Sequence, residues 1–199
     1  TVESMDVLLA FDTTGSMGPS IAAAKRDAET IVSVVGGFAP NTRFAVASFR
    51  DRFYPDGAYR LASPLTSSKA RVTAAIDTLE AVGSTDPRNS EAEAYNLLFN
   101  KSYTDSGIGW RKASRKIVVV IGDAEPHGAG AEGLAGCKDT TKDWDDLSTK
   151  SELAGMRAAR MTLVMIRQAQ TASASLACYS SLVSLAFEGG SARDGGSKD

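Results

Sequence analysis

The sequence has 199 residues, of which 43% are hydrophobic and 23% are charged, a composition typical of one folded α/β domain with a sizeable core. The formal net charge of −2 gives no electrostatic basis for binding nucleic acid or an anionic membrane, because either partner would favour a basic surface. The chain has no run of about 18 apolar residues, so we expect no direct insertion into a bilayer.

Apolar runs alternate with amphipathic segments along the chain, which is typical of an α/β fold with a mostly parallel sheet and helices on both faces. The predicted elements, in chain order, are strand 5–11, helix 19–35, strands 43–49 and 59–65, helices 67–81 and 90–100, strand 116–122, helix 147–159, strand 161–167 and helix 173–187. We expect strand 59–65 to pair antiparallel at the sheet edge. Residues 1–190 are predicted to form one domain, and the Gly-, Ser- and charge-rich residues 191–199 a flexible tail.

The segment from Val7 to Gly18 places an acid and two hydroxyls at alternate positions after an apolar run. The apolar run predicts a buried parallel strand, so Asp12, Thr14 and Ser16 fall in the loop at its carboxyl end, where open α/β sheets bind ligands. Donor atoms that are all oxygen favour a hard cation such as Mg²⁺ and disfavour zinc. In an alternative interpretation, these three residues only cap the following helix.

This segment resembles the D-x-[ST]-x-S signature of the metal-ion-dependent adhesion site in von Willebrand factor type A domains. Two later stretches resemble other parts of that site and follow in the same order: Gly83-Ser84-Thr85-Asp86-Pro87 is similar to its threonine loop, and Ile117–Ala124 to its acid-terminated strand. The resemblance covers about residues 5–190. It implies a site for Mg²⁺, with Mn²⁺ or Ca²⁺ as substitutes, held by Asp12, Thr14, Ser16, Thr85 and Asp123.

The doubly wound strand order 3-2-1-4-5 makes the first and fourth strands neighbours and opens a crevice at their carboxyl ends. Asp12 and Asp123 end these two strands, and two facing carboxylates repel each other unless a cation lies between them. The resemblance implies that the hydroxyls of Thr14, Ser16 and Thr85 serve as neutral ligands. A cation with few anionic ligands stays electrophilic, so we expect it to accept an Asp or Glu carboxylate from a partner protein.

The resemblance therefore predicts a metal-dependent, adhesion-type binding module and not an enzyme. Thr14 replaces the second acid of a haloacid-type phosphatase, no nucleophile elbow is present, and we expect the single histidine, His127, to pack a loop. Two alternatives stay open. One is an intracellular subunit that couples a metal-site contact to an ATPase or chelatase machine, and the other is a structural module with a vestigial metal site.

Two cysteines give the only information about the compartment. Cys137 lies in a Gly-rich polar insertion and Cys178 in an apolar helical segment, which favours a disulfide between a surface loop and the body. The alternative is a buried thiol at Cys178 and a free thiol at Cys137. A disulfide would stabilise the fold by roughly 4 kcal/mol and would imply a secreted or cell-surface protein. The insertion, residues 128–146, is expected to carry partner specificity.

Overall fold

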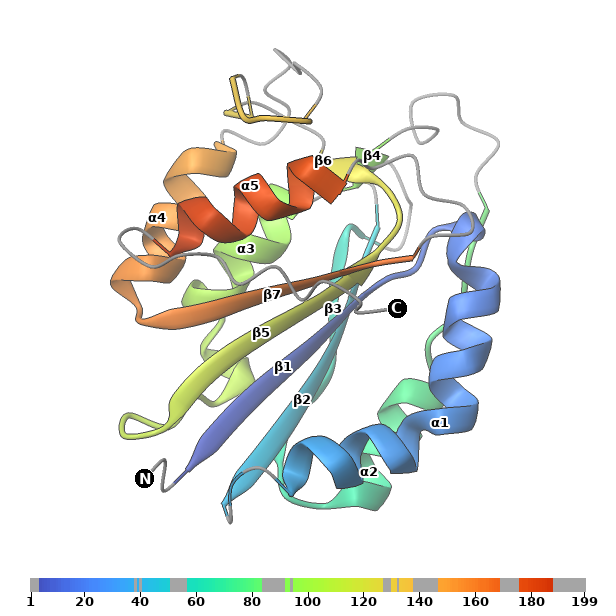
Figure 1. The fold of residues 1–199 in the computed structure, drawn as a ribbon. Coiled ribbons are helices and arrows are strands. Elements are labelled where there is room, and N and C mark those ends of the chain that lie inside the picture. Colours follow the sequence, from blue (N-terminus) through green and yellow to red (C-terminus); the bar gives the residue numbers. More distant parts are fainter. Residues whose placement is uncertain are drawn as a thin grey trace, which may run out of the picture.

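The structure is a computed structural model that describes residues 4–37, 39, 41–50, 57–83, 92–93, 95–126, 130–131, 133–137, 147–168 and 176–187. Its centre is a five-stranded sheet of β1 (Met5–Asp12), β2 (Thr42–Phe49), β3 (Tyr59–Thr66), β5 (Arg115–Gly122) and β7 (Met161–Arg167) (Figure 1). The strand order is β3-β2-β1-β5-β7, and every pair is parallel except the antiparallel pair β2–β3. The predicted fold class, strand order and antiparallel edge are therefore confirmed.

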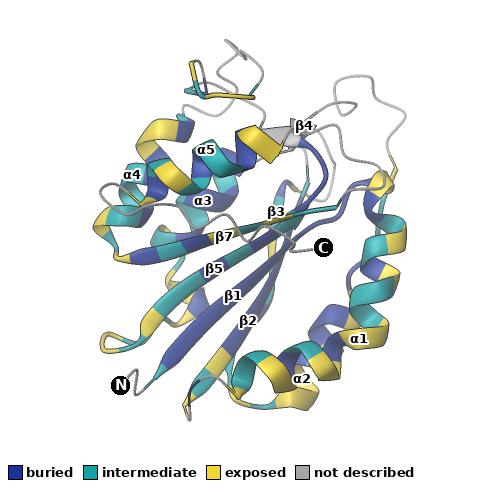
Figure 2. Ribbon diagram, in the orientation of Figure 1, coloured by how far each residue is buried: buried dark blue, intermediate teal, exposed yellow. Residues whose placement is uncertain are grey.

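Helices cover both faces of this sheet. α1 (Gly18–Gly36) and α2 (Lys69–Asp77) lie on one face, and α3 (Tyr95–Thr104), α4 (Thr149–Ala158) and α5 (Leu176–Ala186) lie on the other (Figure 1). β1 is buried along its whole length (Figure 2). Its alternate residues enter two different cores, with Leu8 facing α3–α5 and Leu9 facing α1 and α2. Burial on both faces explains why β1 is continuously apolar from Val7 to Phe11.

The structure corrects the extent of two predicted helices. α2 ends at Asp77, four residues earlier than predicted, because the chain then turns toward the end of β1. There the backbone N–H of Val82 donates to the Thr13 carbonyl at 3.0 Å, a bond that a continuing helix could not make. The predicted helix 90–100 is displaced in sequence: α3 begins at Tyr95 and continues to Thr104.

Four short elements were not predicted. Two 3₁₀ helices, η1 (Gly15–Met17) and η3 (Ser106–Ile108), follow β1 and α3 respectively. Two short strands, β4 (Ala92–Glu93) and β6 (Glu125–Pro126), form a separate parallel pair. None of the described helices is both long enough and apolar enough to cross a membrane. The predicted tail, 191–199, lies outside the described residues.

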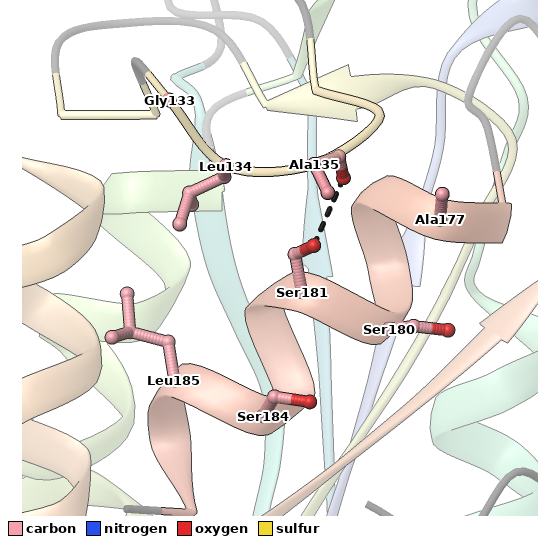
Figure 3. A pocket seen from close by; sticks show the side chains of 8 residues that line it. All are labelled: Gly133, Leu134, Ala135, Ala177, Ser180, Ser181, Ser184 and Leu185. Carbon is pink, nitrogen blue, oxygen red and sulfur yellow. Dashed lines mark hydrogen bonds between the residues drawn. The ribbon is translucent and has the colours of Figure 1, made fainter.

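A disulfide joins Cys137 to Cys178, so the prediction of a disulfide is confirmed and the alternative of two thiols is wrong. It fastens the loop segment 133–137 to the first turn of α5. Ser181 adds a second connection by donating a hydrogen bond to the Ala135 carbonyl at 2.9 Å (Figure 3). The loop and α5 therefore hold each other in place at one end of the helix.

The amino end of β1 carries a partly buried ion pair that the sequence analysis did not identify. Asp6 is fully buried, and its Oδ1 accepts hydrogen bonds from Arg111 Nε at 2.8 Å and Nη2 at 2.6 Å. Its Oδ2 accepts from the Arg111 backbone N–H at 2.9 Å and from Ser114 Oγ at 2.6 Å. Burial alone would raise the pKa of Asp6, but the bonds from Arg111 and Ser114 outweigh burial and lower it.

We expect Asp6→Asn to lower the free energy of unfolding by about 2–4 kcal/mol, because it leaves the Arg111 guanidinium without its counter-charge. The pKa of Asp6 is lower in the folded than in the unfolded protein, so its contribution is complete above about pH 4 and is lost as the pH falls through the folded-state pKa. Urea unfolding between pH 7 and roughly pH 2.5 would measure both the loss of stability and its dependence on pH.

The matched control is Asp27→Asn, which removes the same charge from the exposed Arg26–Asp27 pair. It should change stability by less than about 0.5 kcal/mol. Equal effects of the two substitutions would show that the Asp6–Arg111 pair does not anchor β1.

Candidate metal centre

The register of two parallel strands brings Asp12 and Asp123 to the same edge of the sheet. β1 pairs with β5 so that Phe11 lies opposite Ile121. Asp12 therefore ends β1 beside Gly122, and Asp123 follows directly. A Cβ atom placed on Gly122 would lie only 3.4 Å from the Asp12 Cβ. Both acidic residues are buried, with exposures of 0% for Asp12 and 2% for Asp123.

The loop after β1 connects the two carboxylates through hydroxyl groups. The Thr14 backbone N–H and Oγ1 both donate to Asp12 Oδ1, at 2.9 and 2.7 Å. Thr14 Oγ1 lies 3.4 Å from Ser16 Oγ, which in turn donates to Asp123 Oδ1 at 3.1 Å. Four of the five predicted ligands thus form one cluster of oxygen atoms, contributed by the ends of β1 and β5 and the start of η1.

The alternative that these side chains only cap the following helix is not supported. Thr14 precedes η1 and Met17 precedes α1, and neither side chain accepts a capping hydrogen bond. The Thr14 and Ser16 hydroxyls instead donate to carboxylates. These hydroxyls therefore hydrogen-bond to Asp12 and Asp123 and do not cap the helix.

The second oxygen of Asp12 has no hydrogen-bond partner in the described part of the protein, although it is buried. The pKa of Asp12 is raised to about 7, mainly by burial and also by the charge of Asp123, although hydrogen bonds from Thr14 and from the Asp123 backbone oppose the rise. No basic side chain among the described residues donates to Asp12, in contrast to Asp6 at the other end of β1. A buried carboxylate in these surroundings is destabilised unless a cation approaches it.

The donor atoms fit a hard cation. The cluster offers carboxylate and hydroxyl oxygens, which are ligands that Mg²⁺, Mn²⁺ and Ca²⁺ accept. Within the described ranges, no group of three or more His, Cys, Asp or Glu side chains is placed to hold a metal ion. A cation at this edge would therefore depend on hydroxyl oxygens as well as on the two carboxylates.

Several residues from the sequence analysis lie outside the described residues. These are Thr85, Asp86, His127 and most of the insertion 128–146. The described chain does approach the cluster just before Thr85. Gly83 packs so closely on Gly15 that a Cβ atom on Gly15 would lie 2.9 Å from the Gly83 Cα. The loop after β1 therefore requires glycine at position 15.

Two tyrosines next to the cluster were not recognised as part of its surroundings. The sequence analysis assigned neither Tyr95 nor Tyr179 to the site. Their hydroxyls lie 2.6 Å apart, and that of Tyr179 donates to the Ala124 carbonyl at 2.9 Å. The helical spacing of the apolar residues Cys178, Leu182 and Ala186 indicates the buried face of α5, and this face also includes Tyr179.

A family model for the von Willebrand factor type A domain matches residues 7–125, a range that includes Asp12, Thr85 and Asp123. The chain belongs to this family. Type A domains generally mediate protein–protein interactions, so membership supports a protein-interaction module. A comparison with curated proteins found no match. The disulfide also indicates a non-cytosolic location for this type A domain, because such bonds persist in oxidising compartments.

We expect Asp12→Asn to leave the free energy of unfolding in EDTA unchanged within about 0.5 kcal/mol, or to raise it. The substitution removes a buried negative charge beside Asp123 and keeps an oxygen that accepts from Thr14. Urea unfolding at neutral pH measures the change, with Asp6→Asn as the matched substitution at the other end of the same strand. A loss as large as that of Asp6→Asn would show that ionised Asp12 is already stabilised by the protein.

Proposed function

We propose that this type A domain binds a divalent cation, Mg²⁺ with Mn²⁺ or Ca²⁺ as substitutes, and uses it to bind a partner protein. Asp12, Thr14, Ser16, Thr85 and Asp123 would hold the cation. The observation that carries the proposal is the buried Oδ2 of Asp12, which has no partner among the described residues and lies beside a second carboxylate. The bound cation would supply a positive charge that offsets both carboxylates and attracts an acidic group from outside.

The described chain supports the inclusion of Thr85. The backbone of Val82 pairs with Thr13, and Gly83 lies against Gly15 in the loop after β1. Thr85 follows Gly83 by two residues, a span of at most about 7 Å. The length of chain between Gly83 and Thr85 therefore allows the Thr85 hydroxyl to reach the cluster.

The balance of ligands supports binding of a partner carboxylate. Three of the five proposed ligands are neutral hydroxyls, so the cation would remain electrophilic toward an anionic oxygen. An Asp or Glu of the partner supplies such an oxygen. We propose binding and not catalysis, because Thr14 and Ser16 donate to carboxylates and the sequence lacks a nucleophile elbow.

The disulfide bears on where the domain would work. It supports an extracellular or cell-surface setting, and it argues against an intracellular subunit of an ATPase or chelatase machine. A structural module with a vestigial metal site is the remaining alternative. Metal titration separates this alternative from the proposed function.

We expect calorimetric titration to detect Mg²⁺ and Mn²⁺ binding, and saturating metal to stabilise the fold by about 2.7 kcal/mol at a concentration 100 times the Kd. Asp123→Asn and Thr85→Ala should each weaken binding at least about tenfold, a typical effect of losing a group that supports a metal site. Thr104→Ala is the control, because Thr104 lies at the exposed end of α3. An absence of metal binding in the unmodified protein would favour the vestigial site.

The partner's carboxylate can be tested with acetate as a small probe. We expect acetate to displace water from protein-bound Mn²⁺, which would lower the water-proton relaxation enhancement, whereas neutral acetamide would not. The same titration with Thr104→Ala should reproduce the result. If acetate and acetamide behave alike while Mn²⁺ remains bound, the cation does not recruit an acidic group.

A further inference from the structure

The hydroxyls of Tyr95 and Tyr179 form a buried pair next to the acidic cluster, and neither is among the proposed metal ligands. Tyr95 comes from α3 and Tyr179 from α5, and their exposures are 0% and 2%. Both lie beside Gly122, because a Cβ atom there would clash with the Tyr95 hydroxyl and lie 3.2 Å from that of Tyr179. The pair therefore contacts the backbone that connects β5 to Asp123.

The hydrogen bonds of this pair have a defined direction. Tyr179 donates its single hydroxyl proton to the Ala124 carbonyl at 2.9 Å. The bond of 2.6 Å between the two hydroxyls is then donated by Tyr95 and accepted by Tyr179. Tyr95 thus orients the hydroxyl that holds Ala124, the residue directly after Asp123.

The surroundings fix both rings. Tyr95 packs against Phe49 with ring centroids 5.0 Å apart and against Tyr179 at 6.2 Å. Tyr179 follows Cys178, whose disulfide to Cys137 anchors the first turn of α5. Figure 3 shows the second anchor on this helix, the hydrogen bond from Ser181 to the Ala135 carbonyl. The two hydroxyls therefore come from α3 and α5, and their rings are held by Phe49 of β2 and by the disulfide-anchored first turn of α5.

We propose that Tyr95 and Tyr179 are positioning residues of the metal centre, an inference that rests on the proposed function. By holding the Ala124 carbonyl, they fix the turn that carries Asp123 and keep its carboxylate beside Asp12. Without the Tyr179 hydroxyl, the Ala124 carbonyl loses a buried hydrogen bond and this turn gains freedom. The loss then appears in cation affinity, because the ion needs both carboxylates in one arrangement.

The test compares Tyr179→Phe, Tyr95→Phe and the double variant with Tyr103→Phe. The control removes a hydroxyl from the same helix as Tyr95, but that hydroxyl donates to Glu152 at 2.6 Å, at the contact between α3 and α4. Mn²⁺ affinity is measured by calorimetry, and amide hydrogen exchange at residues 122–124 is measured in EDTA. Unfolding in urea reports the stability of each variant.

We expect Tyr179→Phe to weaken Mn²⁺ binding about tenfold or more and to speed exchange at residues 122–124. Tyr95→Phe should have a smaller effect, and the double variant should match Tyr179→Phe, because Tyr95 acts through Tyr179. Tyr103→Phe should lower stability without changing either quantity. A purely structural role would instead make affinity follow stability in all four variants.

The failures of the two proposals are distinguishable. If the unmodified protein binds no divalent cation, the proposed function and this inference are both overturned. If it binds Mn²⁺ and Tyr179→Phe binds equally well with unchanged exchange, only the positioning role is overturned. If Tyr179→Phe fails to fold, Tyr95→Phe decides in the same way, because unchanged affinity and exchange in that variant contradict the positioning role.

Discussion

The structure depends on how two buried carboxylates are accommodated at the ends of one strand. At its amino end, β1 places Asp6 against the Arg111 guanidinium, and the pair anchors the strand with both charges balanced. At its carboxyl end, β1 places Asp12 beside Asp123, where the Thr14 and Ser16 hydroxyls donate to the two carboxylates and Asp12 Oδ2 has no hydrogen-bond partner among the described residues. A buried carboxylate oxygen without a partner opposes folding, and groups of this kind are concentrated at functional sites.

The rest of the fold can be understood as support for that pair. Burial of β1 on both faces fixes its register with β5, and the register brings Asp12 to Asp123. The early end of α2 lets Val82 pair with Thr13 and brings Gly83 against Gly15. On the other face, α3 and α5 contribute the two tyrosine hydroxyls that hold the residue after Asp123.

The sequence predicted those features that depend on local patterns. The apolar runs located all five main strands, with β7 at its predicted bounds, and the alternate polar residues after β1 located Asp12, Thr14 and Ser16. Features that depend on distant contacts were missed. Arg111 pairs with Asp6 across 105 residues, and no local pattern marks either as a partner.

The same limit applies around the candidate site and within the helices. The pattern of residues 67–81 remains helical after Asp77, and only the backbone pairing with Thr13 shows why α2 ends there. Likewise, the role of Tyr179 depends on a carbonyl 55 residues earlier in the chain.

Whether a cation balances Asp12 and Asp123 can be measured directly in a crystal grown with Mn²⁺, because the ion gives an anomalous signal. We expect an anomalous peak in contact with this oxygen cluster and the Thr85 hydroxyl. A map without a peak there, at a Mn²⁺ concentration that saturates any binding in solution, would show that no cation balances the two carboxylates.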